Sequence, residues 1–141
     1  MTTAVSVEEQ LRAVPLFAAA SEQELARIVA VVRAMSFARG RIICAQGVFG
    51  VGMHVITEGW VQVRATHAPD TRLGPGAYFG EMAVLDGGPR MATVTAVTDV
   101  RTLVLDGYDL SKILDEQPAV ARKLLDHLCQ RLRDQAANIS Q

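Results

Sequence analysis

The middle of the chain is a series of short segments rich in β-branched residues, separated by turn residues, and this pattern limits the fold more than any other feature. Strand-forming apolar residues recur from Phe37 to Leu105. The turns that interrupt them lie at Arg39-Gly40, Gly47, Gly50, Gly52, Glu58-Gly59, Gly74-Pro75-Gly76 and Gly87-Gly88-Pro89. Short strands with turns this frequent are typical of an antiparallel sandwich or roll. The link Thr57-Glu58-Gly59-Trp60 has the length of a tight hairpin, which predicts that the strands on its two sides pair with each other.

Both ends of the chain show helical periodicity instead. Glu8 to Val14 is a candidate short helix, ended by Pro15. A second helix is predicted to begin at Ser21, because Glu24 three residues later completes a capping box. Its apolar stripe consists of Leu25, Ile28, Val29, Val32 and Met35.

Two further helices are predicted after Asp106, one over Tyr108 to Leu114 and a longer one from Pro118. The sequence therefore predicts an α+β fold: an antiparallel β-roll (a double-stranded β-helix, jelly-roll-like) with N-terminal helices and two C-terminal helices. We expect a single domain over residues 1–141, with helices at about 7–34, the roll at about 36–106 and the C-terminal helices at about 107–137.

Composition excludes several classes of protein. The net charge of −1 gives no electrostatic footprint for nucleic acid. The opening MTTAVSVEEQ lacks the basic start of a signal peptide, and runs such as IVAVV are too short to span a bilayer. Cys44 and Cys129 form no CxxC pair, which argues against a disulfide framework or a zinc site. These features predict a cytoplasmic protein without a membrane segment.

Residues 79–94, FGEMAVLDGGPRMATV, carry one acid, Glu81, and one base, Arg90. A Gly-Glu step before a short helical run predicts backbone N–H groups that point outward at the start of a helix, where they favour an anion. The planar fork of Arg90 suits two phosphate oxygens. An acid beside an anion site makes sense when it accepts hydrogen bonds from hydroxyl groups such as those of a ribose. Together the two side chains indicate a nucleotide.

This segment resembles the phosphate-binding cassette of the cyclic nucleotide-binding domains, whose pattern runs roughly F-G-E-(L/M)-A-L-L, a short insert, then P-R-(S/A/T)-A-(T/S)-V. The similarity extends to FARGRIICAQGVFGVGMHVITEGWVQV and to LRAVPLF near the N-terminus, and so covers about residues 10–133. RLGPGAYFGEMA is similar to the short-looped domains of prokaryotic cyclic-nucleotide-gated potassium channels.

The resemblance implies a role for each matching residue. Glu81 would bind the ribose 2′-hydroxyl and Arg90 the cyclic phosphate. Arg131, late in the last helix, would cap the base. Backbone amides would face the ligand at Gly80, Glu81, Met82 and Ala83 and again at Met91 and Ala92. Phe79 and Val63 would form an apolar wall for the purine.

The resemblance also implies a ligand sensor without chemical turnover and without a cofactor. Met91 stands where the family uses a threonine to favour cyclic GMP, so we expect cyclic AMP ahead of cyclic GMP, and we expect the methionine side chain to pack against the pocket. Gln46 stands where an acid is common before Gly47 and is interpreted as a surface or turn change. An effector domain or protein partner would receive the signal.

Three alternatives stay open at this stage. His54 with Glu58 suggests a metal-binding cupin-like barrel, although His67 and His127 do not cluster with them and a metal site needs three or four ligands. A dimerisation module without nucleotide affinity, or a weak homodimer, is suggested by the stripe of Ala121, Leu125, Leu128 and Leu132. A transcription factor would need a helix-turn-helix after the last helix, and we expect no room for one before Gln141. No catalytic triad can be read from the sequence.

Overall fold

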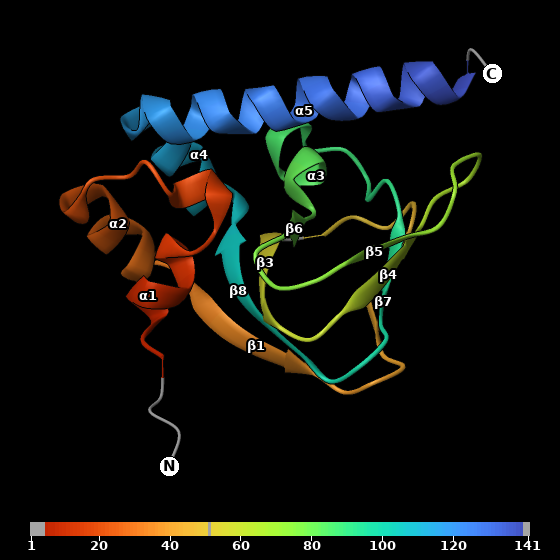
Figure 1. Ribbon diagram of the computed structural model, residues 1–141, viewed down its shortest axis with the longest axis horizontal. Coiled ribbons are helices and arrows are strands. Elements are labelled where there is room, and N and C mark those ends of the chain that lie inside the picture. Colours follow the sequence, from red (N-terminus) through yellow and green to blue (C-terminus); the bar gives the residue numbers. More distant parts are fainter. Residues whose placement is uncertain (1–4, 51, 140–141) are drawn as a thin grey trace.

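The computed structural model describes residues 5–50 and 52–139 of the chain (Figure 1). The helices are α1 (Val7–Arg12), the 3₁₀ helix η1 (Pro15–Phe17), α2 (Glu22–Val29), α3 (Glu81–Asp86), α4 (Gly107–Glu116) and α5 (Pro118–Ile139). The strands are β1 (Arg33–Phe37), β2 (Ile42–Cys44), β3 (Gly52–Glu58), β4 (Val61–Arg64), β5 (Thr71–Leu73), β6 (Tyr78–Phe79), β7 (Thr93–Ala96) and β8 (Val100–Asp106).

The strands form a roll of two four-stranded antiparallel sheets, as the sequence predicted. One sheet has the order β1-β8-β3-β6 and the other has the order β2-β7-β4-β5. In Figure 1 the helices α1 and α2 lie at one end of the roll, and α5 runs along one side with α3 and α4 beneath it. Within the described residues, no helix is both long enough and apolar enough to cross a membrane.

The predicted hairpin across residues 57–60 is wrong, because β3 and β4 belong to different sheets. β3 already has β8 and β6 on its two sides, and β4 has β7 and β5, so neither strand has a free edge for the other. The link instead turns the corner between the sheets. At Gly59 the φ angle is +86°, and a Cβ atom would lie 2.1 Å from the carbonyl oxygen of Asp99.

The N-terminal helices begin as predicted, but they end earlier. Ser21 caps α2 in a complete capping box with Glu24. The helix expected to reach about residue 34 ends at Val29, and Arg33–Phe37 forms an edge strand that pairs along its whole length with β8. Tertiary pairing with β8 therefore overrides the helical stripe, and Met35 lies opposite Thr102 in the sheet.

Two apolar clusters make the core. The larger one joins the helices to the outer face of the first sheet, and it includes Phe17, Leu25, Met53, Leu105 and Leu110. The smaller one fills the inside of the roll between the two sheets, and it includes Phe37, Cys44, Ile56, Phe79 and Val94. Because side chains alternate along a strand, β3 and β8 supply residues to both clusters and connect them.

Candidate functional site

The segment 79–94, called the cassette below, begins with a sharp turn from β6 into α3. Gly80 caps α3 in the left-handed conformation, with φ +89°. A Cβ atom there would lie 2.2 Å from Nη1 of Arg90 and 2.9 Å from the carbonyl oxygen of Gly52. Glycine therefore allows both the turn and the close approach of the arginine.

Arg90 is held at the other end of the cassette and points back toward its start. Only 6% of the residue is exposed. Its Nη1 donates a hydrogen bond of 3.0 Å to the carbonyl oxygen of Gly80. Its backbone N–H donates to Val48 and its carbonyl accepts from Gly47, both at 2.9 Å, so the loop after β2 fixes its position. Among the described residues, Nε has no hydrogen-bond partner, and the guanidinium keeps donors available for an anion.

Glu81, the first residue of α3, is 1% exposed and pairs with Arg131 of α5. Burial of a carboxylate without a partner would be costly, and the guanidinium supplies that partner. The two sequence-predicted residues Glu81 and Arg131 are thus brought together although they are 50 positions apart.

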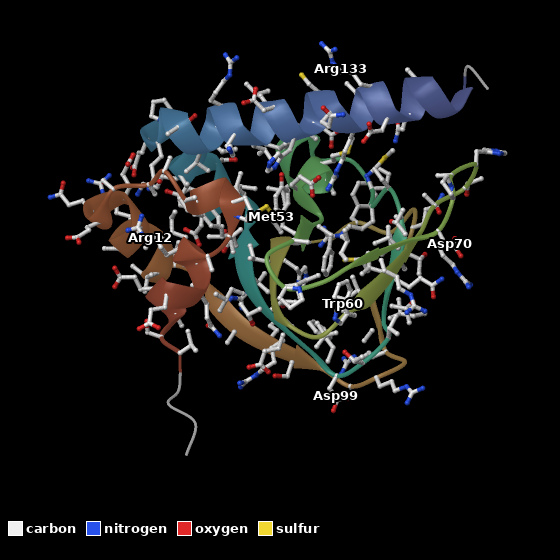
Figure 2. The ribbon with its side chains drawn as sticks, in the orientation of Figure 1. Arg12, Met53, Trp60, Asp70, Asp99 and Arg133 are labelled. Carbon is white, nitrogen blue, oxygen red and sulfur yellow. The ribbon has the colours of Figure 1, made fainter. Side chains whose placement is uncertain are left out.

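Arg131, not its neighbour Arg133, is the arginine of α5 that reaches the cassette. Figure 2 shows Arg133 on the side of α5 that faces away from the roll. The Arg131 guanidinium also lies over the ring of Tyr78, with its carbon 5.9 Å from the ring centre.

A second contact holds α5 near the same place. The Tyr78 hydroxyl and Nδ1 of His127 form a hydrogen bond of 2.6 Å. Burial, with the nearby Glu81 carboxylate as a second cause, raises the pKa of Tyr78 to about 12, so the phenol keeps its proton at neutral pH. Sequence reasoning missed both residues. The signal was present, because His127 lies four residues before Arg131 and therefore on the same helix face.

The other predicted ligand residues differ in exposure. Phe79 and Ala83 are buried, and Val63 and Ala92 are partly buried, with Val63 packed against the inner cluster. As whole residues, Met82 and Met91 are 37% and 61% exposed. Met91 was expected to pack against the pocket, and its side chain instead points to solvent in this structure.

His54 lies inside the roll and is engaged with apolar and hydroxyl groups. Its ring stacks on Phe79 at 4.9 Å between ring centres, and Nδ1 is 3.1 Å from the hydroxyl oxygen of Thr102. Burial, and then the positive charge of Arg90, lower its pKa to about 4. Across the residues that the structure describes, no three His, Cys, Asp or Glu side chains are grouped as they would be around a metal ion.

Comparison with known proteins gives a consistent match. The sequence model described as cyclic nucleotide-binding domain matches residues 34–117. A cyclic nucleotide-gated potassium channel of Mesorhizobium japonicum is 43% identical over 109 residues, which is 77% of this chain and 30% of the channel. The cyclic AMP receptor protein of Thermus thermophilus is 32% identical over 125 residues, 85% of this chain and 58% of the receptor.

The structural match agrees. The crystal structure of the Thermus thermophilus catabolite activator protein superposes with a TM-score of 0.81 at 30% identity, over 89% of this chain and 62% of that one. The chain spans only 28% to 31% of the length of three bacterial potassium-channel relatives.

Proposed function

Because this chain belongs to the cyclic nucleotide-binding domain family, we propose that it is a sensor that binds cyclic AMP, in preference to cyclic GMP, within the cassette and the adjoining wall of the roll. The observation that carries the proposal is the burial of one carboxylate and one guanidinium, Glu81 and Arg90, at opposite ends of a single short segment. Two buried charges that both keep hydrogen-bonding capacity are what a ligand with hydroxyl groups and a phosphate requires.

Each group then has a role. Arg90 binds the cyclic phosphate, assisted by backbone amides from Gly80 to Ala83 and at Met91 and Ala92. Glu81 accepts a hydrogen bond from the ribose 2′-hydroxyl. Val63 and Phe79 give the purine an apolar wall. The support for this arrangement is that Arg90 is already anchored through its own backbone, so little ordering is needed when the anion arrives.

Arg131 is the cap in this proposal. In this structure its guanidinium pairs with Glu81. When ribose hydroxyls satisfy one oxygen of Glu81, the guanidinium is free to lie over the base while α5 stays close to α3. The bias toward this capped arrangement equals the difference in ligand affinity between the two arrangements.

The preference for cyclic AMP rests on Met91, which offers no side-chain hydroxyl to a guanine amino group. The 32% identity to a protein named a cyclic AMP receptor also supports it.

The test is calorimetric titration of the nucleotide-stripped chain with cyclic AMP and with cyclic GMP. We expect affinity for cyclic AMP in the micromolar range or tighter, and weaker binding of cyclic GMP. Arg90→Ala should weaken cyclic AMP binding by at least about tenfold, because a hydrogen bond to a charged group contributes roughly 1.5–3 kcal/mol. Binding within twofold of the parent, in a variant with an unchanged circular dichroism spectrum, would refute the phosphate assignment.

The matched pair for the cap is Arg131→Ala and Arg133→Ala. Each substitution replaces one exposed arginine of α5 with alanine, so both remove the same side-chain atoms and the same charge. We expect the first to weaken binding severalfold and the second to leave it unchanged. Equal effects would remove Arg131 from the site.

The role of the chain in signalling is proposed from the proteins to which it is similar. The chain spans under a third of its channel relatives, so we assign it the regulatory part of an effector, which changes state as α5 responds to the ligand. The exposed Leu125 and Leu132, seven residues apart on α5, are the seam of a weak homodimer in this proposal. Sedimentation velocity over a range of concentrations, with Leu132→Glu as the dissociating variant, tests that seam.

A further inference from the structure

Gln46, interpreted from the sequence as a surface or turn change, is hydrogen-bonded to two other segments of the chain. Its Nε2 donates to the hydroxyl oxygen of Thr66 at 2.8 Å, and its Oε1 accepts from the backbone N–H of Thr66 at 3.3 Å. Its own backbone N–H donates to the hydroxyl oxygen of Thr93 at 3.0 Å. The two side-chain contacts, called the Gln46 bridge below, use both the donor and the acceptor of the amide.

The sheet register places the Gln46 bridge around the start of β7. In the second sheet β7 lies between β2 and β4 and runs antiparallel to both. The ends of β2 and β4 therefore lie beside the first residues of β7, with Arg64 opposite Thr93. Gln46 and Thr66 each follow their strand by two residues. The bridge thus joins the two flanking strands at the point where the cassette enters the sheet.

Gln46 also lies in the turn that holds Arg90. The backbone N–H of Val48 donates to the carbonyl oxygen of Ala45 at 3.1 Å, which makes Gln46 and Gly47 the central residues of a β-turn. Gly47 has a φ angle of +82°, as in the second central position of a type II turn. The N–H of Gly47 donates to the carbonyl of Arg90, and the carbonyl of Val48 accepts from the N–H of Arg90.

The segment that carries Arg90 has little regular structure of its own. Residues 87–92 lie between α3 and β7 and belong to neither element. The 45–48 turn therefore places the Arg90 backbone, and Gln46 joins that turn to the 65–70 link between β4 and β5. A chain of contacts runs from Thr66 through Gln46 and the turn to Arg90.

We infer that Gln46 is a positioning residue for the anion site and acts through the 45–48 turn on the backbone of Arg90. The inference rests on the function proposed above, in which Arg90 binds the cyclic phosphate. An anion binds most tightly to donors that are already placed, because it does not have to supply the free energy of ordering them. Without the bridge the turn occupies other positions for part of the time. The apparent affinity is then reduced to the fraction of chains in which Arg90 is in place.

The chemistry of the bridge predicts which side chains can replace Gln46. A glutamate carboxylate can accept hydrogen bonds from both the N–H and the hydroxyl group of Thr66, because a threonine hydroxyl donates as well as accepts. An alanine can form neither contact. Because Gln46 is exposed, both substitutions should leave the core intact.

The test is calorimetric titration of cyclic AMP into the nucleotide-stripped parent and into the variants Gln46→Ala, Gln46→Glu and Gln62→Ala. We expect Gln46→Ala to weaken binding by about threefold to tenfold, the range that a net hydrogen bond contributes. Gln46→Glu should bind within about twofold of the parent, since it restores both contacts to Thr66.

Gln62→Ala is the matched control, because it removes the same side-chain atoms. Gln62 lies on β4, and its Nε2 donates to Asp70 of the same 65–70 link at 3.2 Å. The variant loosens that link without removing the Gln46 bridge, so we expect it to leave cyclic AMP binding unchanged. Equal weakening by Gln46→Ala and Gln62→Ala would overturn the inference, and so would a Gln46→Glu variant that binds as weakly as Gln46→Ala.

Hydrogen exchange of the nucleotide-free chain, followed by NMR, separates this inference from the proposed function. The amides of Gly47 and Arg90 should exchange about threefold to tenfold faster in Gln46→Ala, and at the parent rate in Gln46→Glu. Unchanged exchange in Gln46→Ala would overturn the positioning role whether or not nucleotide binds. A parent chain with no affinity for cyclic AMP would refute the function proposed above, and the exchange rates would still decide whether Gln46 positions Arg90.

Discussion

At the residue scale, the unusual feature of this chain is how many polar side chains it buries around one turn. Glu81, Arg90 and His54 are all less than a tenth exposed. Each is stabilised in a different way. Glu81 forms an ion pair with Arg131, and Arg90 donates a hydrogen bond to the Gly80 carbonyl. The neutral ring of His54 stacks on Phe79. Buried polar groups without such partners would cost stability, so these contacts also position the site.

The buried imidazole of His54 predicts a pH dependence of stability. Its folded pKa of about 4 lies below the ordinary value of 6.5. Between these two values the unfolded chain takes up a proton that the folded chain does not, so stability is full above pH 6.5 and falls as the pH drops toward 4. From pH 7 to pH 5 we expect a loss of about 2 kcal/mol from this group.

Urea unfolding of the parent and of His54→Phe at the two pH values measures this contribution. Phenylalanine keeps the stacking on Phe79 but cannot be protonated. The difference between the two proteins should therefore change by about 2 kcal/mol between pH 7 and pH 5. The same pH dependence in both proteins would show that His54 is not the group responsible.

At the element scale, α5 is attached to the rest of the protein through contacts that run from Val120 to Arg131. Val120 and Leu124 are buried, His127 bonds Tyr78 and Arg131 bonds Glu81, whereas residues 132–136 are exposed. Figure 1 shows α5 continuing past α3. The two polar contacts therefore join α5 to Tyr78 and Glu81, on either side of the turn that begins the cassette.

Tyr78→Phe removes one of these contacts without changing the packing of the ring. We expect hydrogen exchange in the middle of α5 to become about fivefold faster, since a net hydrogen bond contributes about 1 kcal/mol. Tyr108→Phe is the control, because Tyr108 is 76% exposed on α4. Mass-spectrometric exchange that is equally fast in both variants would contradict a holding role for the Tyr78–His127 contact.

At the scale of the whole molecule, β8 connects the two apolar clusters. Val100 packs inside the roll, and Leu103 and Leu105 pack against the helices. The helices and the roll should therefore unfold together. Leu105→Ala should destabilise the protein by about 2–5 kcal/mol, because Leu105 is fully buried and a cavity would remain.

Two probes test this coupling. Far-UV circular dichroism reports the helices. The fluorescence of Trp60, the single tryptophan of the chain, reports the roll at the link between β3 and β4. Both should shift by the same amount in Leu105→Ala. Leu125→Ala, at a position 58% exposed, should change stability by less than about 0.5 kcal/mol. Separate transitions for the two probes would show that the clusters unfold independently.

Local chemistry was readable from the sequence wherever the residues that decide a feature are close along the chain. The capping box of Ser21 and Glu24, the Gly80 turn into α3 and the start of α5 at Pro118 depend on neighbours within four residues. The cassette was also readable locally, since its acid, its base and its turn glycine lie within eleven positions of the sequence. The roll itself was predictable because strand length and turn frequency limit the architecture.

Only the tertiary structure decided which strands pair and which side chains meet. The start of β1, up to Met35, looked helical by periodicity, yet pairing with β8 made it part of a strand. The short link after β3 joins two sheets because both of its strands already have neighbours. The meeting of Glu81 with Arg131 and of Tyr78 with His127 joins positions about 50 residues apart. Such contacts depend on how α5 packs across the finished roll, and the free energy of that packing is a property of the whole fold that no local stretch of sequence contains.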